Sequence, residues 1–135
     1  MKKQTAVAIV MMVAMVSMAA ASQSTTKNIE AAGKNYVIGM RSGNQGLAES
    51  SLMQIAKIKM RYPRADFADA KHVIDSLAVN STSPSVRYKA YLTSNVCDDP
   101  KWFAMKDHAA YADNDEFFSS VWSHMQERAL GSRAN

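Results

Sequence analysis

A series of helix-start signals, each followed by apolar residues at helical spacing, constrains the fold most strongly. Asn44 precedes a long amphipathic segment that ends before Pro63, and Asp66 precedes a second one. Ser83 and Asp99 are each followed by proline, which fits the first turn of a helix because its missing N–H needs no partner there. These signals predict helices over residues 44–62, 66–79 and 84–97, and a shorter helix that starts at Asp99.

A further signal predicts a last amphipathic helix over residues 115–130. Asp113 and Glu116 have the spacing of a capping box. One face of this helix carries only apolar residues, which are Phe117, Phe118, Val121, Trp122, Met125 and Ala129. Such a face is too large to leave in water, so it either caps the end of the other helices or docks on a partner. For the second case, the candidate partner-binding residues are Phe117, Val121, Trp122 and Met125.

Strand signals are weak, and the sequence predicts an all-α fold of antiparallel helix pairs. The β-rich stretch at Tyr36–Ile38 is too short to outweigh the helical patterns. A tight connection at residues 62–65 predicts that the helices on either side of it are antiparallel neighbours. We expect a polar spacer at residues 22–34, one helical domain at residues 35–130 and a frayed tail at residues 131–135.

The N-terminus has the pattern of a cleavable signal peptide. Lys2 and Lys3 precede an uncharged apolar run that ends in small residues at Ala19–Ala21. The run is too short to span a bilayer comfortably, since roughly 20 apolar residues are needed. We predict a signal peptide over residues 1–21 and cleavage after Ala21. The mature domain is then expected in the periplasm or outside the cell, without a stable membrane anchor.

Charge and cysteine content narrow the possible partners. Removal of Lys2 and Lys3 lowers the 16 basic residues to 14, against 12 acidic residues, which leaves a net charge of +2. Because no basic stripe with interleaved aromatic residues is evident, nucleic acid is not implied as a partner. Cys97 is the single cysteine, so no internal disulfide can form, and we expect this thiol to be buried in a packed core.

Motifs that would indicate catalysis or metal binding are lacking. The three histidines have no partner at the spacing of a metal motif, and the carboxylates near the helix starts serve better as caps than as calcium ligands. Ser50 and Ser51 lack a G-x-S-x-G turn, and no Gly-rich phosphate loop occurs. We therefore expect no enzyme, no metal and no cofactor. The histidines are His72, His108 and His124, and the carboxylates are Asp98, Asp99, Asp113, Asp115 and Glu116.

Two cations on the helix at residues 84–97 need an explanation. Arg87 and Lys89 lie on a helix that we place in the core, where an unpaired charge is costly. We expect Arg87 to pack its stem and to pair with an acidic residue of a neighbouring helix.

An internal repeat leads to a family resemblance. The cap-and-helix pattern before Leu47 recurs before Val86, an offset of 39 residues, and a period of about 40 with two helices per unit is typical of HEAT and armadillo repeats. PSVRYKA at residues 84–90 resembles the start of the second helix of a HEAT repeat. GMRSGNQGLAESSL at residues 39–52 is similar to small exported HEAT-like proteins of bacteria. The resemblance covers residues 36–97 and departs at Ala48, where the motif has arginine.

The resemblance implies a short HEAT-like solenoid or an irregular helical bundle with an extended binding surface. The functional expectation is a non-enzymatic exported domain that binds another protein of the cell envelope. The alternative is a helical envelope protein that binds a small molecule, a lipid or a metal, with Trp102, Tyr111 and Trp122 lining a pocket.

Overall fold

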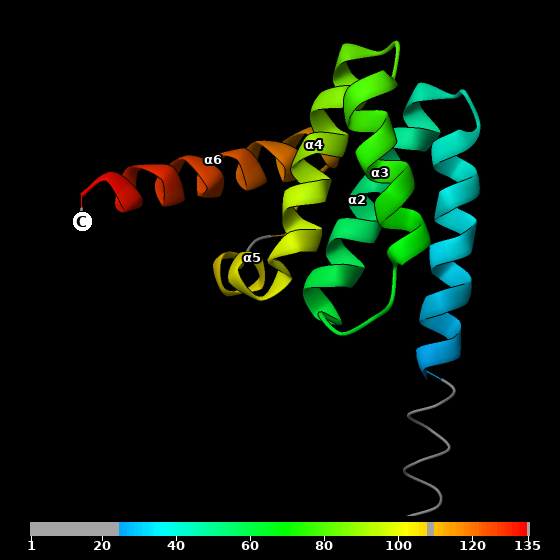
Figure 1. The fold of residues 1–135 in the computed structure, drawn as a ribbon, viewed down its shortest axis with the longest axis horizontal. Coiled ribbons are helices and arrows are strands. Elements are labelled where there is room, and N and C mark those ends of the chain that lie inside the picture. Colours follow the sequence, from blue (N-terminus) through cyan, green and yellow to red (C-terminus); the bar gives the residue numbers. More distant parts are fainter. Residues whose placement is uncertain (1–24, 108–109, 135) are drawn as a thin grey trace, which may run out of the picture.

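The protein is all-helical over residues 25–107 and 110–134, which are the residues that the computed structural model describes (Figure 1). The expected signal peptide at residues 1–21, and His108, lie outside the described residues. Over the described ranges, a helix covers residues 25–41 and precedes five further ones. These are α2 (Gln45–Arg61), α3 (Ala68–Asn80), α4 (Pro84–Asp98), α5 (Pro100–Lys106) and α6 (Asn114–Arg133).

The predicted caps form at three helices. The side chain of Asn44 accepts a hydrogen bond from the Leu47 N–H at 2.9 Å, and the Ser83 hydroxyl accepts one from the Val86 N–H at 3.3 Å. Asp113 caps α6 by accepting from the Glu116 N–H at 2.9 Å. These side chains satisfy N–H groups that have no partner within the helix, which explains why the three helices begin where the sequence predicts.

At the other two helices the side-chain caps differ from the prediction, although α5 begins at Pro100 with Asp99 as its N-cap residue, as predicted. Asp66 accepts from the Ala68 N–H at 3.0 Å, but the N-cap residue of α3 is Phe67, so α3 begins one residue later than a cap at Asp66 predicts. Asp99 makes no capping bond to α5 and instead accepts from the guanidinium of Arg128 at 2.8 Å. Its carboxylate thereby ties α5 to α6.

The largest correction concerns the expected polar spacer, because residues 25–34 are helical and continue to residue 41. The β-rich stretch Tyr36–Ile38 lies within this N-terminal helix. Its inner face packs on the body of the protein through Ile29 and Met40. Gly33 lies so close to Phe67 that an added Cβ would be 2.6 Å from the ring. A few apolar and small residues at helical spacing are thus enough to pack this segment as a helix, although most of its residues are polar.

At the other end, α6 continues to Arg133 instead of fraying after Leu130. Gly131 costs the helix only about 1 kcal/mol relative to alanine. Because each added residue of an established helix gains a further backbone hydrogen bond, one glycine does not end it. The C-terminal half of α6 projects from the body as an arm, above the short helix α5 (Figure 1).

Helix α4 holds the centre of the packing. It packs against α3 and α2, and these two contact α4 more extensively than they contact each other, which corrects the expected pairing across residues 62–65. A wide buried arc of α4 allows this, and it includes Val86, Ala90, Leu92, Thr93 and Val96. α6 adds Phe117, Phe118 and Val121 to the same core.

Candidate aromatic interface

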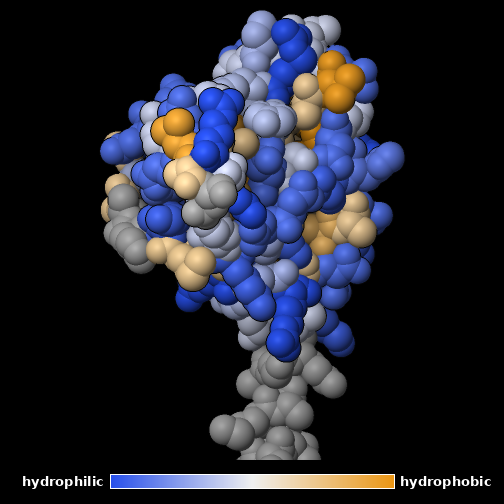
Figure 2. Space-filling model, turned by 60° about the vertical axis from the view of Figure 1, so that its left-hand side comes forward, coloured by the Kyte–Doolittle hydropathy of each residue, from blue (hydrophilic) through white to orange (hydrophobic). Residues whose placement is uncertain are grey.

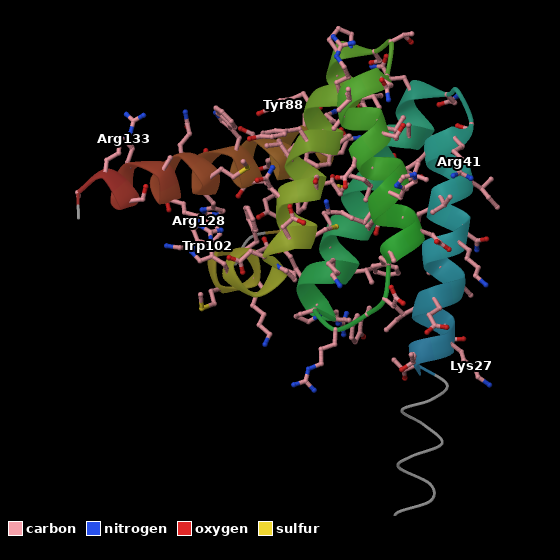
Figure 3. All side chains as sticks on the ribbon, viewed as in Figure 1. Lys27, Arg41, Tyr88, Trp102, Arg128 and Arg133 are labelled. Carbon is pink, nitrogen blue, oxygen red and sulfur yellow. The ribbon has the colours of Figure 1, made fainter. Side chains whose placement is uncertain are left out.

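Three large aromatic side chains remain exposed where α6 leaves the body. Tyr88 and Tyr91 on α4 are 42% and 49% exposed, and Trp122 on α6 is 39% exposed. We call these three residues the aromatic surface. Tyr88 and Trp122 contact each other edge to face, with ring centroids 6.2 Å apart and an interplanar angle of 61°. Figure 3 places Tyr88 at the junction of α4 and α6.

Polar side chains near the aromatic surface include three uncharged ones and the cation Arg87, which lies one turn before Tyr91. Ser119 and Gln126 lie one helical turn on either side of Trp122, and both are exposed. Asn95, one turn beyond Tyr91, donates its amide to the Tyr91 carbonyl at 2.8 Å. Figure 2 shows a largely hydrophilic exterior on the side where the α6 arm comes forward, with small separate hydrophobic areas. The aromatic surface therefore has large rings at its centre, with neutral hydrogen-bonding groups and Arg87 near its edge.

The candidate partner-binding residues of α6 divide into two groups. Phe117 and Val121 are buried in the core, so they anchor α6 and are closed to a partner in this structure. Trp122 is exposed, and Met125 is half-buried beside the core. The apolar face of α6 is thus used mainly to attach the helix, and Trp122 is the candidate that belongs to the aromatic surface.

A buried lysine fixes the start of α6 against α2 and α4. Lys89 is only 4% exposed, and its ammonium donates to Glu49 at 2.7 Å and to Asn114 at 2.8 Å. It also donates to Asp115, in the first turn of α6. Glu49 in turn accepts from the Ser85 hydroxyl at 2.6 Å. Charge-assisted bonds of this kind join α2, α4 and α6.

The two buried charges stabilise each other's ionised form. Burial alone would raise the pKa of Glu49, but hydrogen bonds from Lys89 and Ser85 and the charge of Lys89 together lower it below its ordinary value. Burial alone would lower the pKa of Lys89, whereas its bonds to Asp115 and Glu49 raise it above the ordinary value. Both groups are therefore charged at neutral pH.

This network corrects two expectations about charge. The amphipathic pattern of residues 44–62 predicts Glu49 on the solvent side of its helix, whereas it is buried against α4. Arg87 was expected to pair with an acid of a neighbouring helix, but it donates to the Ser81 carbonyl at 2.6 Å. Lys89 is the α4 cation with acidic partners on neighbouring helices. The periodicity of α4 alone does not predict these ion pairs, because the side chains that contact Lys89 come from α2 and α6.

The aromatic residues expected to line one pocket each pack against a different neighbour. Trp102 contacts Phe103, and the guanidinium of Arg128 lies 4.9 Å from its ring centroid. Tyr111 contacts Phe117 edge to face, whereas Trp122 contacts Tyr88. These contacts attach α5 and the segment before α6 to the rest of the protein.

A groove elsewhere offers space for a small molecule. It lies between the N-terminal helix and the connection from α2 to α3, with a volume of about 610 Å³. Ile29, Tyr62 and Pro63 form part of its apolar lining, and Arg61 and Lys101 are among its charged residues. Neither Tyr88 nor Trp122 lines this groove, so it is separate from the aromatic surface.

Cys97 and the two histidines that the structure describes, His72 and His124, form no shared site. The Cys97 thiol is half-buried, and desolvation raises its pKa to about 11, which disfavours the reactive thiolate. His72 is exposed on α3, and His124 is half-buried on α6. In the described part of the chain, no three His, Cys, Asp or Glu side chains are grouped so that they could hold a metal ion. None of the described helices combines the length and the apolar character needed to cross a membrane.

Comparisons of the chain with family models, curated proteins and solved structures found no match.

Proposed function

We propose that the protein is an exported, non-enzymatic helical domain of the cell envelope that binds another protein. The aromatic surface on α4 and α6 is the proposed contact. The observation that carries the proposal is the cluster of Tyr88, Tyr91 and Trp122, which are all at least 39% exposed although they lie beside a well-filled core. The proposed export rests on the signal-peptide pattern of residues 1–21.

The chemistry of the aromatic surface fits a protein partner. Tyrosine and tryptophan are enriched at the centres of protein interfaces, where charged residues are depleted. Ser119, Gln126 and Asn95 supply hydrogen-bonding groups near the edge without adding charge. The helix that carries Trp122 is also held in place before binding, because Phe117 and Phe118 fix α6 and the Lys89 network fixes its first turn. Such preorganisation reduces the ordering cost of association.

The proposed function is best tested by crosslinking in cells. A photoreactive amino acid replaces Tyr91 in one strain and Lys57, an exposed residue of α2, in a control strain. We expect a discrete adduct with one protein from the Tyr91 position and none from the Lys57 position. The Trp122→Ser substitution should then weaken the purified complex at least about 10-fold, as interface hot spots do. Equal adducts from both positions, or unchanged affinity of Trp122→Ser, would contradict the proposal.

The groove beside the N-terminal helix favours a second candidate function, the binding of a small molecule or lipid. Its volume of about 610 Å³ lies within the range of ligand pockets. Arg61, Arg64 and Lys101 outnumber Glu30 and Asp66 in its lining, which favours an anionic ligand with an apolar part. Native mass spectrometry of the protein from envelope fractions distinguishes the candidates. A retained small ligand supports this second function, and a co-purifying protein that requires Trp122 supports the first.

A further inference from the structure

The outer face of the N-terminal helix carries a regular set of cations. Lys27, Lys34 and Arg41 are spaced by seven residues, which brings them to the same side of a helix. Ile38 lies between Lys34 and Arg41 on this side and is 68% exposed. We call these four residues the basic stripe. It runs for about 21 Å along the helix, at 1.5 Å per residue.

The opposite face of the same helix packs against the core. Ile29 and Met40 pack inward, and an added Cβ on Gly39 would lie 2.2 Å from the Ser51 hydroxyl oxygen of α2. These close contacts keep the basic stripe turned outward. Figure 3 shows Lys27 and Arg41 pointing away from the body on the same side of the protein.

The cations of the basic stripe are not neutralised within the protein. None of Lys27, Lys34 and Arg41 forms an ion pair within the described ranges, whereas Lys71, Lys89, Lys106 and Arg128 all do. Two acids lie near the stripe. Glu30 is on the same helix, and Asp69 of α3 shares a shallow groove with Lys34 and Arg41. The basic stripe therefore keeps an excess of positive charge.

The position of the stripe in the chain indicates what it faces. Only Ser22, Gln23 and Ser24 separate the apolar run that ends at Ala21 from Thr25, the first residue that the structure describes, which is helical. Three residues span at most about 11 Å even when extended. While the apolar run is held in the membrane during export, the N-terminal helix is consequently held at the lipid surface. The basic stripe is then the outward-facing charged surface that lies nearest to the membrane.

We propose that the basic stripe binds the surface of a membrane that contains anionic phospholipids. The ammonium and guanidinium groups contact lipid phosphates, and Ile38 enters the interface between the head groups and the acyl chains. A basic amphipathic helix that presents an apolar side chain binds membranes in this way. With three cations the binding is reversible, and it holds the released domain near the membrane without anchoring it. This inference rests on the proposed export and is independent of the aromatic surface.

Vesicle sedimentation tests the proposal with the protein recovered from cells after export. We expect binding to vesicles of phosphatidylcholine mixed with phosphatidylglycerol, little binding to phosphatidylcholine alone, and loss of binding in high salt because salt screens the charges. The triple variant Lys27→Gln, Lys34→Gln, Arg41→Gln should bind about 100-fold more weakly, since each cation near an anionic surface contributes about fivefold. Circular dichroism checks that it remains folded.

A second triple variant controls for net charge. Lys57→Gln, Lys106→Gln and Arg133→Gln remove three exposed cations from α2, α5 and α6, away from the N-terminal helix. We expect binding within about fivefold of the unchanged protein, because distant charges are screened. Equal losses in both triple variants would overturn the proposal, because net charge and not the basic stripe would then govern binding. Equal binding to both vesicle types would also overturn it. So would the absence of vesicle binding together with a second copy or an acidic protein bound to the basic stripe.

Discussion

Burial of a charged residue depends on partners that its own helix does not reveal. Glu49 has a polar side chain on the flank of an amphipathic helix, and the pattern of α2 alone predicts exposure. In the structure α4 covers it, and Lys89 supplies the compensating charge. The sequence predicted that a cation on this core helix pairs with an acidic residue of a neighbouring helix, but the prediction named Arg87. Placing a Lys–Glu contact between residues 40 apart requires the relative position of two helices, which the periodicity of one helix does not contain.

The Lys89–Glu49 pair is expected to be strongly coupled in its effect on stability. Lys89→Met keeps the length of the side chain but leaves a buried carboxylate without its cation, and we expect a loss of roughly 3 kcal/mol of unfolding free energy. Glu49→Gln should cost roughly 1 kcal/mol, because Lys89 keeps Asn114 and Asp115. The double variant should lose at least about 1 kcal/mol less than the sum of the single losses. Urea unfolding of the four proteins measures the coupling.

An exposed pair provides the matched control for this cycle. Lys71 and Asp75 lie 2.8 Å apart on α3, with side chains 28% and 49% exposed. Lys71→Met and Asp75→Asn should each cost less than about 1 kcal/mol, because water already solvates these charges. Additive losses at Lys89 and Glu49 would show that the buried contact contributes no more than an exposed one.

At the scale of the helices, prediction succeeded where a cap preceded strong periodicity. Asn44, Ser83 and Asp113 act as predicted, because capping is a local interaction between residues three apart. The N-terminal helix was missed because the residues at its described start, Thr25–Asn28, are polar. Its repeat of Lys27, Lys34 and Arg41 at a spacing of seven was the available signal. The aromatic surface was only partly predicted, because Tyr88 joins Trp122 through a contact between two helices.

The packing of the N-terminal helix predicts an unusual effect of alanine. Gly33→Ala would normally stabilise a helix by about 1 kcal/mol. Here the new methyl group would lie 2.6 Å from the Phe67 ring, so the ring or the helix has to move, and we expect a net loss of about 1 to 2 kcal/mol. Thermal unfolding followed by circular dichroism measures the change.

Gly131→Ala is the control, because nothing lies within 4 Å of the added Cβ in the exposed last turns of α6. This variant should be as stable as the unchanged protein or slightly more stable. If both alanine variants gained stability, the close contact between the N-terminal helix and Phe67 would not exist in solution.

At the scale of the whole molecule, α4 is the element to which the rest attaches. Lys89 joins it to α2 and α6, while Ser94 joins it to α3 through a hydrogen bond to Asp75 at 2.6 Å. The sequence predicted the all-α class, which follows from local patterns, and the structure confirms it. It did not predict that α4 lies between α2 and α3, because that arrangement depends on which of several wide apolar faces meet. The HEAT-like relationship of the helix pairs stays a proposal.

Both ionic networks make the stability of the whole molecule depend on pH in a defined direction. Burial opposes ionisation of Glu49 and Asp75, but their bonds to Lys89 and to Lys71 outweigh it, so the pKa of each carboxylate is below its ordinary value. A lowered folded-state pKa means that the unfolded chain binds more protons in acid, so the stabilisation is complete above the ordinary pKa values and is lost as the pH falls through the folded-state values. Urea unfolding at a series of pH values should show a plateau near neutral pH and a decline that begins near the ordinary value of 4.5 for Glu49.

The Glu49→Gln variant should be less stable at neutral pH and should lose less unfolding free energy on acidification, because Glu49 no longer titrates. An acid decline of equal size in Glu49→Gln and the unchanged protein would show that the buried network does not control the pH dependence.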